Sequence, residues 1–416
     1  MRNAKLQQWE LKQQMKKALE DLIVLDLGQI YNGPYCSLML AFQGAKVIKV
    51  EPLNGENLRV RRKGDCHELL MLNSNKLGIS LDLKSPEGKA VFLELVKKAD
   101  VLVENFSLGA MDRLGLGYDV LNKINPQLIY ATGKGYGLDG PYADRPAMDL
   151  TIQAMGGVMA TTGFADRPPV KAGPALCDFL GGIHLFGGIT TALYHREKTG
   201  KGQLVEVSMH DAIYPTLASA LGAYYSQGGK VSQRTGNQHS GMATAPYNVY
   251  PTEDGYIAIL CVADRQWQSL LKVMNKEEFL EDERFQTNID RSANTYLVDE
   301  IVTGWTSGKK KMDIADMLIK ANVPHAPVQA IDEVADDPHL KQRGMIREIV
   351  HPKEGKIRVP GSPIRLSDSV LEEVIPAPMI GQHTDQVLQE LLGFDEEKLT
   401  YLRDNNIIRS IETMKQ

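Results

Sequence analysis

The sequence predicts an α/β protein in which a doubly wound parallel sheet is followed by a second lobe of short strands and helices. Three observations carry this prediction. A strand, a helix and a second strand form a unit of about thirty residues that begins at Leu22, the same alternation repeats as far as Val207, and glycines become frequent after about Gln227.

The first unit is bounded by turn and helix signals. Residues 22–27 (LIVLDL) are typical of a buried strand, and residues 28–34 form a Gly/Asn/Pro turn. Pro34 opens an apolar helix that Gly44 closes, and the strand 46–50 (KVIKV) then ends at Glu51. A strand, a crossover helix and a strand of this length predict a parallel pair.

The alternation continues along the first half of the chain. Ser85-Pro86 is typical of an N-cap and first helical residue, which predicts a helix over 87–98. Asp178 precedes a helix of small residues from Phe179 to about His195, which Gly200 ends. Further strands are expected at 79–83, 101–103, 128–131 and 204–207.

The second lobe is expected from about residue 228 to Pro327, with a strand at 256–260 after the turn Asp254-Gly255. Beyond it we expect a helix at 331–344, a strand at 357–359 and a helix at 385–392. Periodicity does not decide whether this tail rejoins the first lobe.

Composition narrows the function classes. The chain has 416 residues, of which 43% are hydrophobic, and this is enough to form two lobes. Its net charge of −5 argues against nucleic-acid binding, which usually requires an excess of basic residues. The four cysteines are far apart, so we expect reduced thiols in a cytoplasm, no disulfides and no metal site. Residues 5–19 predict an amphipathic helix, and no segment is expected to reach membrane-spanning length.

The loop 28–34 lies where a Rossmann fold carries its dinucleotide fingerprint. It lacks G-x-G-x-x-G, which argues against a nicotinamide oxidoreductase. The helix start could hold a phosphate or adenine, or the loop could be only a turn. A cluster of basic residues follows Glu51 and contains Arg59, Arg61, Arg62 and Lys63. It could be a solvated surface, or it could attract a polyanionic nucleotide.

Asp178 lies among small residues at a helix start, in the segment GPALCDFLGG. The simplest interpretation is an N-cap. The same position would keep the carboxylate ionised through the helix dipole, and an ionised carboxylate is nucleophilic. No sequence feature couples Cys177 to His184, so a buried thiol and a core histidine are the simpler interpretation of that pair.

Several short motifs gain meaning from their order and spacing. They are Leu25-Asp26-Leu27, Gly33-Pro34, Gly44 to Pro52, Leu81 to Lys84, Val103 to Phe106, Gly135-Tyr136-Gly137 and Gly381 to Asp385. Together with Asp178 they resemble the class III CoA-transferases, the formyl-CoA transferase family, over nearly the whole chain.

The resemblance implies a homodimer of two interlocked, ring-shaped subunits. Each subunit would have a Rossmann-like CoA-binding lobe over 1–227, a smaller α+β lobe over 228–327, and a return segment over 328–416 that completes the large lobe. No nucleic-acid or membrane partner is implied.

The resemblance also implies roles for single residues. Asp178 would be the covalent nucleophile, and Asn237 or His239 could orient the acceptor acid or simply form a turn. Some relatives have a basic residue directly after the acid at the position of Glu51, where this chain has Pro52. Arg59, Arg61 or Arg62 could take over the role of that basic residue. The implied CoA contacts are Tyr31, Asn32, Leu81, Lys84, Asn105, Phe106, Arg113, Arg145 and Asp149.

The α-methylacyl-CoA racemases are a second branch that resembles this chain over the same motifs. Their second proton carrier is a histidine directly before the acid at the position of Asp149, and this chain has Met148 there. A methionine cannot shuttle a proton, so transfer is favoured over racemisation.

The implied reaction moves CoA from an acyl-CoA to a carboxylic acid through an aspartyl anhydride and an aspartyl-CoA thioester on Asp178. The Gly181-Gly182 turn or the glycine-rich start of the small lobe would supply oxyanion donors. CoA and acyl-CoA would be substrates, with no permanently bound cofactor. A non-catalytic CoA-binding protein stays an alternative, and the sequence does not identify the donor or the acceptor acid.

Overall fold

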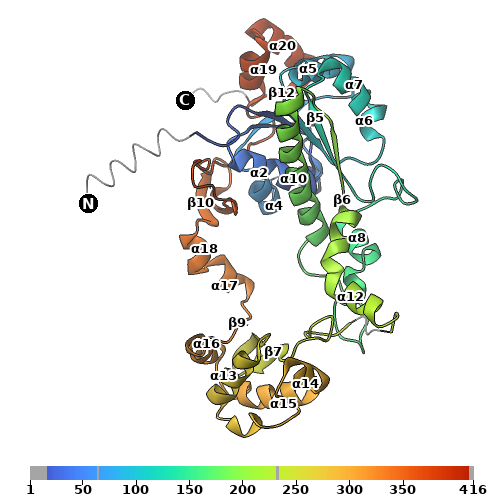
Figure 1. Cartoon of the computed structure of the whole chain (residues 1–416). Helices are drawn as coiled ribbons and strands as arrows, with labels where there is room; N and C mark the ends of the chain where they lie inside the picture. Colours follow the sequence, from blue (N-terminus) through green and yellow to red (C-terminus); the bar gives the residue numbers. More distant parts are fainter. Residues whose placement is uncertain (1–15, 63–64, 231–233, 412–416) are drawn as a thin grey trace. The chain divides into compact units, whose positions relative to one another are not determined.

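The computed structural model describes residues 16–62, 65–230 and 234–411. The chain divides into two compact units (Figure 1). Unit 1 contains the described residues up to Ile152, Ala175–Ala212 and the C-terminal part from Asp337, and unit 2 contains Gln153–Pro174 and Ile213–Asp336. The chain thus changes unit after residues 152, 174, 212 and 336. The sequence suggests boundaries at 227 and 327, and it does not predict the excursion of residues 153–174.

One sheet organises unit 1, and among the described residues its order is β12-β3-β2-β1-β4-β5-β6. All neighbouring pairs are parallel except β12 with β3. The order 3-2-1-4-5-6 is that of a doubly wound Rossmann sheet, so the predicted parallel α/β lobe is confirmed. The strands are β1 (Ile23–Asp26), β2 (Lys46–Glu51), β3 (Lys76–Leu81), β4 (Val101–Glu104), β5 (Ile129–Lys134), β6 (Leu204–Ser208) and β12 (Ile408–Arg409).

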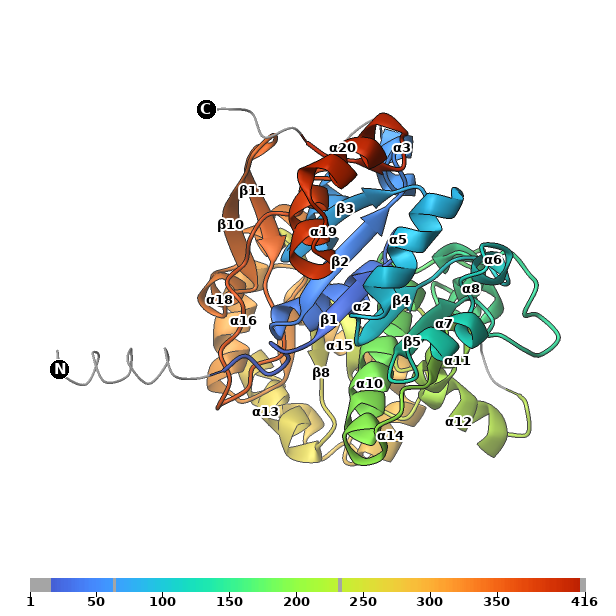
Figure 2. The ribbon, with the colours of Figure 1, turned by 90° about the horizontal axis from the view of Figure 1, so that it is seen from above.

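Helices cover both faces of this sheet (Figure 2). Successive strand residues point to opposite faces, so Val24 packs with α2 (Asn32–Phe42) and α10 (Leu176–Thr199), whereas Leu25 packs on the other side. The second face is covered by α5 (Pro86–Val96), α7 (Tyr118–Ile124), α19 (Thr384–Leu392) and α20 (Glu396–Asp404). Two apolar layers therefore fix the sheet from both sides.

Shorter helices of unit 1 lie in the connections between these elements. They are α3 (Asn57–Arg62), α4 (His67–Leu72), α6 (Ala110–Arg113), α8 (Asp149–Met155), which ends in unit 2, and α11 (Met209–Ile213).

Helix boundaries test the predicted caps. The Ser85 hydroxyl accepts a hydrogen bond from Gly88 N at 2.9 Å, and α5 begins at Pro86, as predicted. Gly200 ends α10 with a φ of 70°, which is also as predicted. The single helix expected at 331–344 is wrong. The structure has α17 (Ile331–Ala335) and α18 (Pro338–Gln342), because Asp337 caps a new helix that Pro338 begins.

The C-terminal part of the chain adds to unit 1. A hairpin of β10 (Ile346–His351) and β11 (Gly355–Pro360) is followed by α19 and α20, and β12 then pairs with the edge strand β3. The expected strand 357–359 and helix 385–392 are confirmed within these elements.

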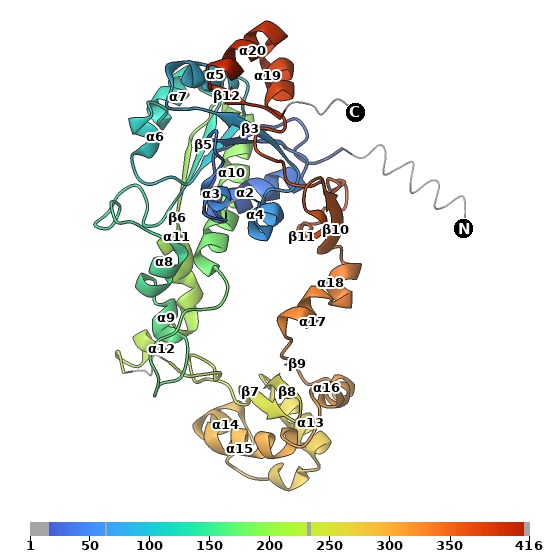
Figure 3. The same cartoon turned by 180° about the vertical axis from the view of Figure 1, so that it is seen from behind.

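Unit 2 is built around a small antiparallel sheet of β7 (Tyr247–Thr252), β8 (Gly255–Leu260) and β9 (His325–Pro327), seen at the bottom of Figure 3. Trp267, Leu270 and Val298 belong to its apolar core. Its helices include α9 (Val158–Thr161), α12 (Ala218–Ser226), α13 (Asp264–Met274), α14 (Asn288–Ala293), α15 (Thr295–Thr306) and α16 (Lys311–Lys320).

Two sequence expectations concern membranes and targeting. The expectation that no segment reaches membrane-spanning length is wrong, because the 24-residue α10 is long and apolar enough by length and composition. One face of α10 packs in the core of unit 1 through Leu185 and Ile189, and a core helix meets the same criterion. The helix expected over residues 5–19 lies mostly outside the described residues.

Candidate active site

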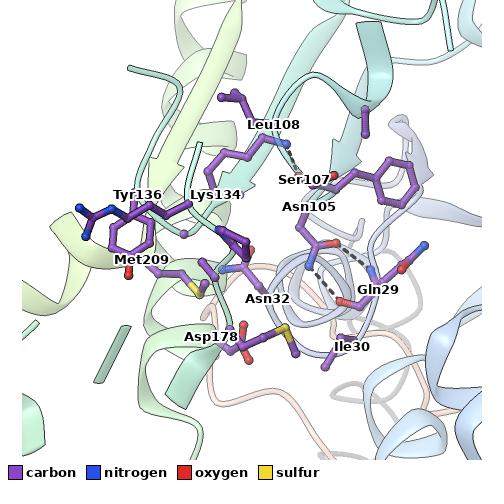
Figure 4. Close-up of a pocket in the computed structure, with 18 of the residues that line it drawn as sticks. Gln29, Ile30, Asn32, Asn105, Ser107, Leu108, Lys134, Tyr136, Asp178 and Met209 are labelled. Carbon is purple, nitrogen blue, oxygen red and sulfur yellow. Dashed lines mark hydrogen bonds between the residues drawn. The ribbon is translucent and has the colours of Figure 1, made fainter. Parts of the chain in front are cut away.

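A cavity of about 640 Å³ opens at the carboxyl ends of the strands of unit 1. It adjoins the loops after β1 and β4, where the strand order reverses and where doubly wound sheets bind their ligands. Figure 4 shows side chains from these loops, from β5 and from α10 around it. Its lining includes Gln29, Ile30, Asn32, Arg61, Asn105, Phe106, Ser107, Lys134, Tyr136, Arg145, Met148, Asp178 and Met209.

Hydrogen bonds join the two loops at this edge. Asn105 accepts from Gln29 N at 2.8 Å and donates from Nδ2 to Gln29 O at 2.9 Å. Ile30 has a φ of 64°, which is unfavourable for a β-branched residue, and its N–H donates to Glu56 Oε2 at 3.0 Å. The wall that these residues form is therefore held in one conformation.

Buried charges lie beneath the first loop. Asp26 accepts from Gly28 N at 2.7 Å, from Ser37 Oγ at 2.7 Å and from Lys76 Nζ at 2.9 Å. Burial raises the pKa of Asp26, but the charges of Lys76 and Lys49 outweigh it and lower that pKa. Burial also lowers the pKa of Lys76 to about 8, so the ammonium persists at neutral pH beside Asp26.

Lys134, at the end of β5, fixes the loop after β4. Its ammonium donates to both Glu104 oxygens at 2.9 and 3.0 Å and to Phe106 O at 2.6 Å. These three bonds use all three N–H groups of the ammonium, so Lys134 positions the Asn105-Phe106 loop.

Asp178 lies in the first turn of α10, is 9% exposed, and lines the cavity. The helix begins at Leu176, so Asp178 follows its start and is not the N-cap predicted from the sequence. Asp149 has the capping role instead. Its Oδ1 accepts from Cys177 N at 2.8 Å and from Asp178 N at 3.3 Å.

The two acids influence each other. Burial, and next the negative charge of Asp149, raise the pKa of Asp178 to about 7. The sequence analysis expected the helix start to keep Asp178 ionised, but burial and the neighbouring carboxylate act against ionisation and raise the pKa into the neutral range. Burial and the same two acids raise the pKa of Cys177 to about 12, so this thiol stays neutral. His184 is exposed and its Nδ1 lies 2.8 Å from Leu180 O, so it does not activate Cys177.

Asn32, the first residue of α2, is 2% exposed and borders the same cavity. Neither amide atom has a hydrogen-bond partner among the residues that the structure describes. Glycine is needed on both sides of it. A Cβ atom on Gly133 would lie 2.1 Å from Oδ1, and one on Gly181 would lie 2.2 Å from Nδ2.

The other expected site residues lie elsewhere. Leu81 and Lys84 line a smaller neighbouring cavity of about 130 Å³ that Phe106 shares. The Tyr31 ring centroid lies 6.0 Å from that of Phe179, and the exposed Arg113 donates to Leu108 O at 3.3 Å.

Asn237 and His239 belong to unit 2. Asn237 lines a hollow of about 410 Å³ formed by residues of that unit. His239 Nδ1 accepts from Gly241 N at 3.1 Å, which is the geometry of a turn.

The basic residues of the cluster after Glu51 lie in different environments. Arg59 is buried, with its Nε 2.9 Å from Glu51 Oε1 and its Nη2 2.7 Å from Pro378 O. It holds protein groups, so it is unavailable as a substitute for the basic residue absent at Pro52. Arg61 is exposed and lines the cavity. Lys63 lies outside the described residues.

The expected oxyanion donors also need correction. Gly181 and Gly182 are not in a turn but inside α10, where backbone N–H groups belong to the helix hydrogen bonds. Gln29 lies in the loop 28–34 that the sequence analysis considered for ligand binding, whereas Lys134, Tyr136 and Met209 were not predicted as cavity residues. The position of Lys134 at the carboxyl end of a parallel strand was the available signal for it.

The fold and the cavity define the class of protein: a doubly wound α/β protein with a cavity at the switch point of its sheet, lined by the buried carboxylate of Asp178. The chain belongs to CoA-transferase family III, which it matches over residues 19–384. The resemblance stated from the sequence motifs is thereby confirmed.

Relatives of assigned activity share this family. The chain is 35% identical to the formyl-CoA:oxalate CoA-transferase of Streptomyces avermitilis, over 95% of this chain and 100% of the relative. It is 39% identical to the acetyl-CoA:oxalate CoA-transferase of Acetobacter aceti, over 85% and 90%. The succinyl-CoA:mesaconate CoA-transferase of Haloarcula hispanica is 35% identical, over 90% and 96%. A solved CaiB/BaiF family protein from Brucella suis superposes with a TM-score of 0.80 at 36% identity, over 91% of this chain and 100% of that one.

Proposed function

We propose that this chain is an acyl-CoA:carboxylate CoA-transferase in which Asp178 is the covalent nucleophile. One observation carries the proposal: the buried Asp178 carboxylate lines the main cavity at the switch point of the sheet. Membership of CoA-transferase family III supports it. The named relatives use oxalate or mesaconate as acids, which favours a small dicarboxylic acid as acceptor here.

The reaction has four steps. An oxygen of ionised Asp178 attacks the thioester carbon, the C–S bond breaks, and CoA leaves as a thiolate with an acyl–aspartyl anhydride behind. The thiolate attacks the aspartyl carbonyl carbon and displaces the donor carboxylate, giving an aspartyl-CoA thioester. The acceptor carboxylate then displaces CoA thiolate and forms a second anhydride. The thiolate finally attacks the acceptor acyl carbon and releases Asp178.

CoA is proposed to lie along the carboxyl edge of the sheet. Asn105, Phe106 and Arg145 line the main cavity, and Leu81 and Lys84 line the smaller one beside it. Tyr31 and Arg113 are further proposed contacts, whereas Asp149 would act by holding the start of α10. We further propose an interlocked homodimer and a cytoplasmic location, and mass determination in solution tests the dimer.

The principal test is the substitution Asp178→Ala. Transfer between acetyl-CoA or formyl-CoA and oxalate should fall at least 10³-fold, because the covalent route is lost, while the Kd of free CoA should change little. Asp119→Ala is a matched control, since Asp119 also lies in the first turn of a helix, α7, but is exposed. Full activity of the Asp178→Ala enzyme would refute the proposal.

Trapping tests the intermediate directly. Enzyme quenched during turnover with hydroxylamine present should carry a hydroxamate on Asp178 in peptide mass spectra. An adduct on another residue would contradict the mechanism.

Racemisation of 2-methylacyl-CoA is the second candidate, since that branch resembles the same motifs. Met148 lines the cavity and offers no proton-transfer group. Exchange of the α-proton in heavy water, without added acid, would favour the racemase.

A further inference from the structure

The side chain of Asn32 lies where three elements of unit 1 meet. It begins α2, and its amide packs against Gly133 of β5 on one side and Gly181 of α10 on the other. Gly181 is three residues beyond Asp178 and therefore lies on the same face of α10, one turn along. Asn32 and Asp178 both line the main cavity, where Figure 4 labels them.

Packing alone does not explain an amide at this position. Burying an amide without a hydrogen-bond partner is unfavourable, and an apolar side chain could fill the same space. Asn73 is a useful contrast. It is equally buried, but its Nδ2 donates to Leu69 O at 3.0 Å and its Oδ1 accepts from Lys76 at 2.8 Å. Of these two buried asparagines, only Asn32 keeps both amide atoms unpaired among the described residues.

The nearby backbone donors of α10 are already used. Asp149 binds the N–H groups of Cys177 and Asp178, and the N–H groups of Gly181 and Gly182 lie within the helix. A carbonyl oxygen that becomes negative during attack by Asp178 needs a donor from another element. The Asn32 Nδ2 group, which borders this turn of α10, has two N–H bonds to offer.

We propose that Asn32 binds the acyl carbonyl oxygen of the substrate and stabilises the negative charge that develops on it while Asp178 attacks. The inference rests on the proposed function and names a second catalytic residue for it. The amide turns about its Cβ–Cγ bond towards the cavity when the acyl group arrives, a rotation whose energy well is broad. Gly133 and Gly181 leave the space that the amide occupies.

The test compares two probes that are not turned over. One is free CoA, and the other is a ketone analogue of acetyl-CoA in which a methylene group replaces the thioester sulfur. Asn32→Ala should raise the Kd of the ketone about tenfold more than the Kd of free CoA, because only the ketone carries the acyl oxygen. Any contact that Asn32 makes with CoA itself would affect both probes equally. Transfer by this variant should fall about 10²- to 10³-fold.

Thermal unfolding separates this role from a structural one. Asn32→Ala removes no hydrogen bond to the part of the chain that the structure describes, so its Tm should stay equal or rise. Asn73→Ala should lower the Tm without changing the ratio of the two Kd values. Equal weakening of both probes by Asn32→Ala, or no weakening of the ketone, would refute the inference.

A second variant covers the case in which Asn32→Ala does not fold. Gly181→Ala favours the helix but would place a Cβ atom 2.2 Å from Asn32 Nδ2, so it should displace the amide and weaken the ketone selectively. If this variant binds the ketone like wild type, the inference is wrong. A wild-type enzyme that binds neither probe would refute the proposed function itself, and the inference with it.

Discussion

The carboxylate of Asp178 is buried beside a second carboxylate, that of Asp149, at the start of one helix. Its pKa of about 7 means that about half of the side chains are neutral at pH 7. A neutral carboxyl group is not nucleophilic, so this environment makes the proposed reaction depend on pH in the physiological range.

The first prediction is a pH–rate profile set by Asp178. The activity kcat/KM should rise about tenfold per pH unit below pH 6 and become constant above about pH 8, because only ionised Asp178 attacks. Initial rates between pH 5.5 and 9 measure it. A flat profile across this range would mean that Asp178 is ionised throughout or is not the nucleophile.

The second prediction concerns stability. The folded pKa of Asp178, about 7, lies above the ordinary value of 3.8, so ionisation destabilises the fold as the pH rises from about 4 to 7. Asp178→Asn removes this penalty and should raise the free energy of unfolding by about 2–4 kcal/mol at pH 8, but by little near pH 4. Urea unfolding at both pH values measures the difference. An equal effect at both pH values would show that charge is not the cause.

At the scale of elements, α10 is capped by a residue of another helix. Asp149 begins α8 and binds the first N–H groups of α10, so one side chain links the two helix starts. This contact decides where Asp178 lies and also contributes to its raised pKa.

The third prediction separates these two effects of Asp149. Asp149→Asn keeps an acceptor oxygen but removes the charge, so the Tm should change little while the pH–rate profile moves to lower pH. Asp149→Ala also removes the cap and should cost about 1–2 kcal/mol of stability. Unfolding and pH–rate measurements on both variants test this. An unchanged profile in the Asn variant would exclude an electrostatic role for Asp149.

At the scale of the whole chain, the C-terminal segment completes the sheet begun by the N-terminal half. β12 pairs with β3, and α19 and α20 cover one face of the sheet. The residues that this segment buries include Val387, Leu388, Leu399, Leu402 and Ile408.

The fourth prediction is that a chain ending at residue 383 does not fold. Loss of five buried apolar side chains removes about 7–15 kcal/mol, which is comparable with the whole stability of a domain. Leu402→Ala is a graded control and should cost about 2–5 kcal/mol while the chain still folds. Circular dichroism and solubility measure both. Cooperative unfolding of the shortened chain would contradict the prediction.

Local sequence patterns predicted much of the architecture. The strand and helix alternation, the Ser85 cap and the Gly200 helix end depend on residues within a few positions of each other, and each is confirmed. Strand β3 begins earlier than expected. Its first residue, Lys76, is polar, and its burial depends on partners that include Asp26, 50 positions away in the chain.

The sequence by itself determined the parallel α/β lobe and, through the order of its motifs, the CoA-transferase family. Only the tertiary structure decided that Asp149 caps the helix of Asp178 and that Arg59 is buried with Glu51. It also decided that the amide of Asn32 lines the same cavity as Asp178 and has no partner among the residues that the structure describes. The physical reason is the separation along the chain of the residues that interact. Caps and periodic faces form between near neighbours in the chain, whereas burial, pKa and hydrogen-bond pairing depend on residues that folding brings together from distant positions.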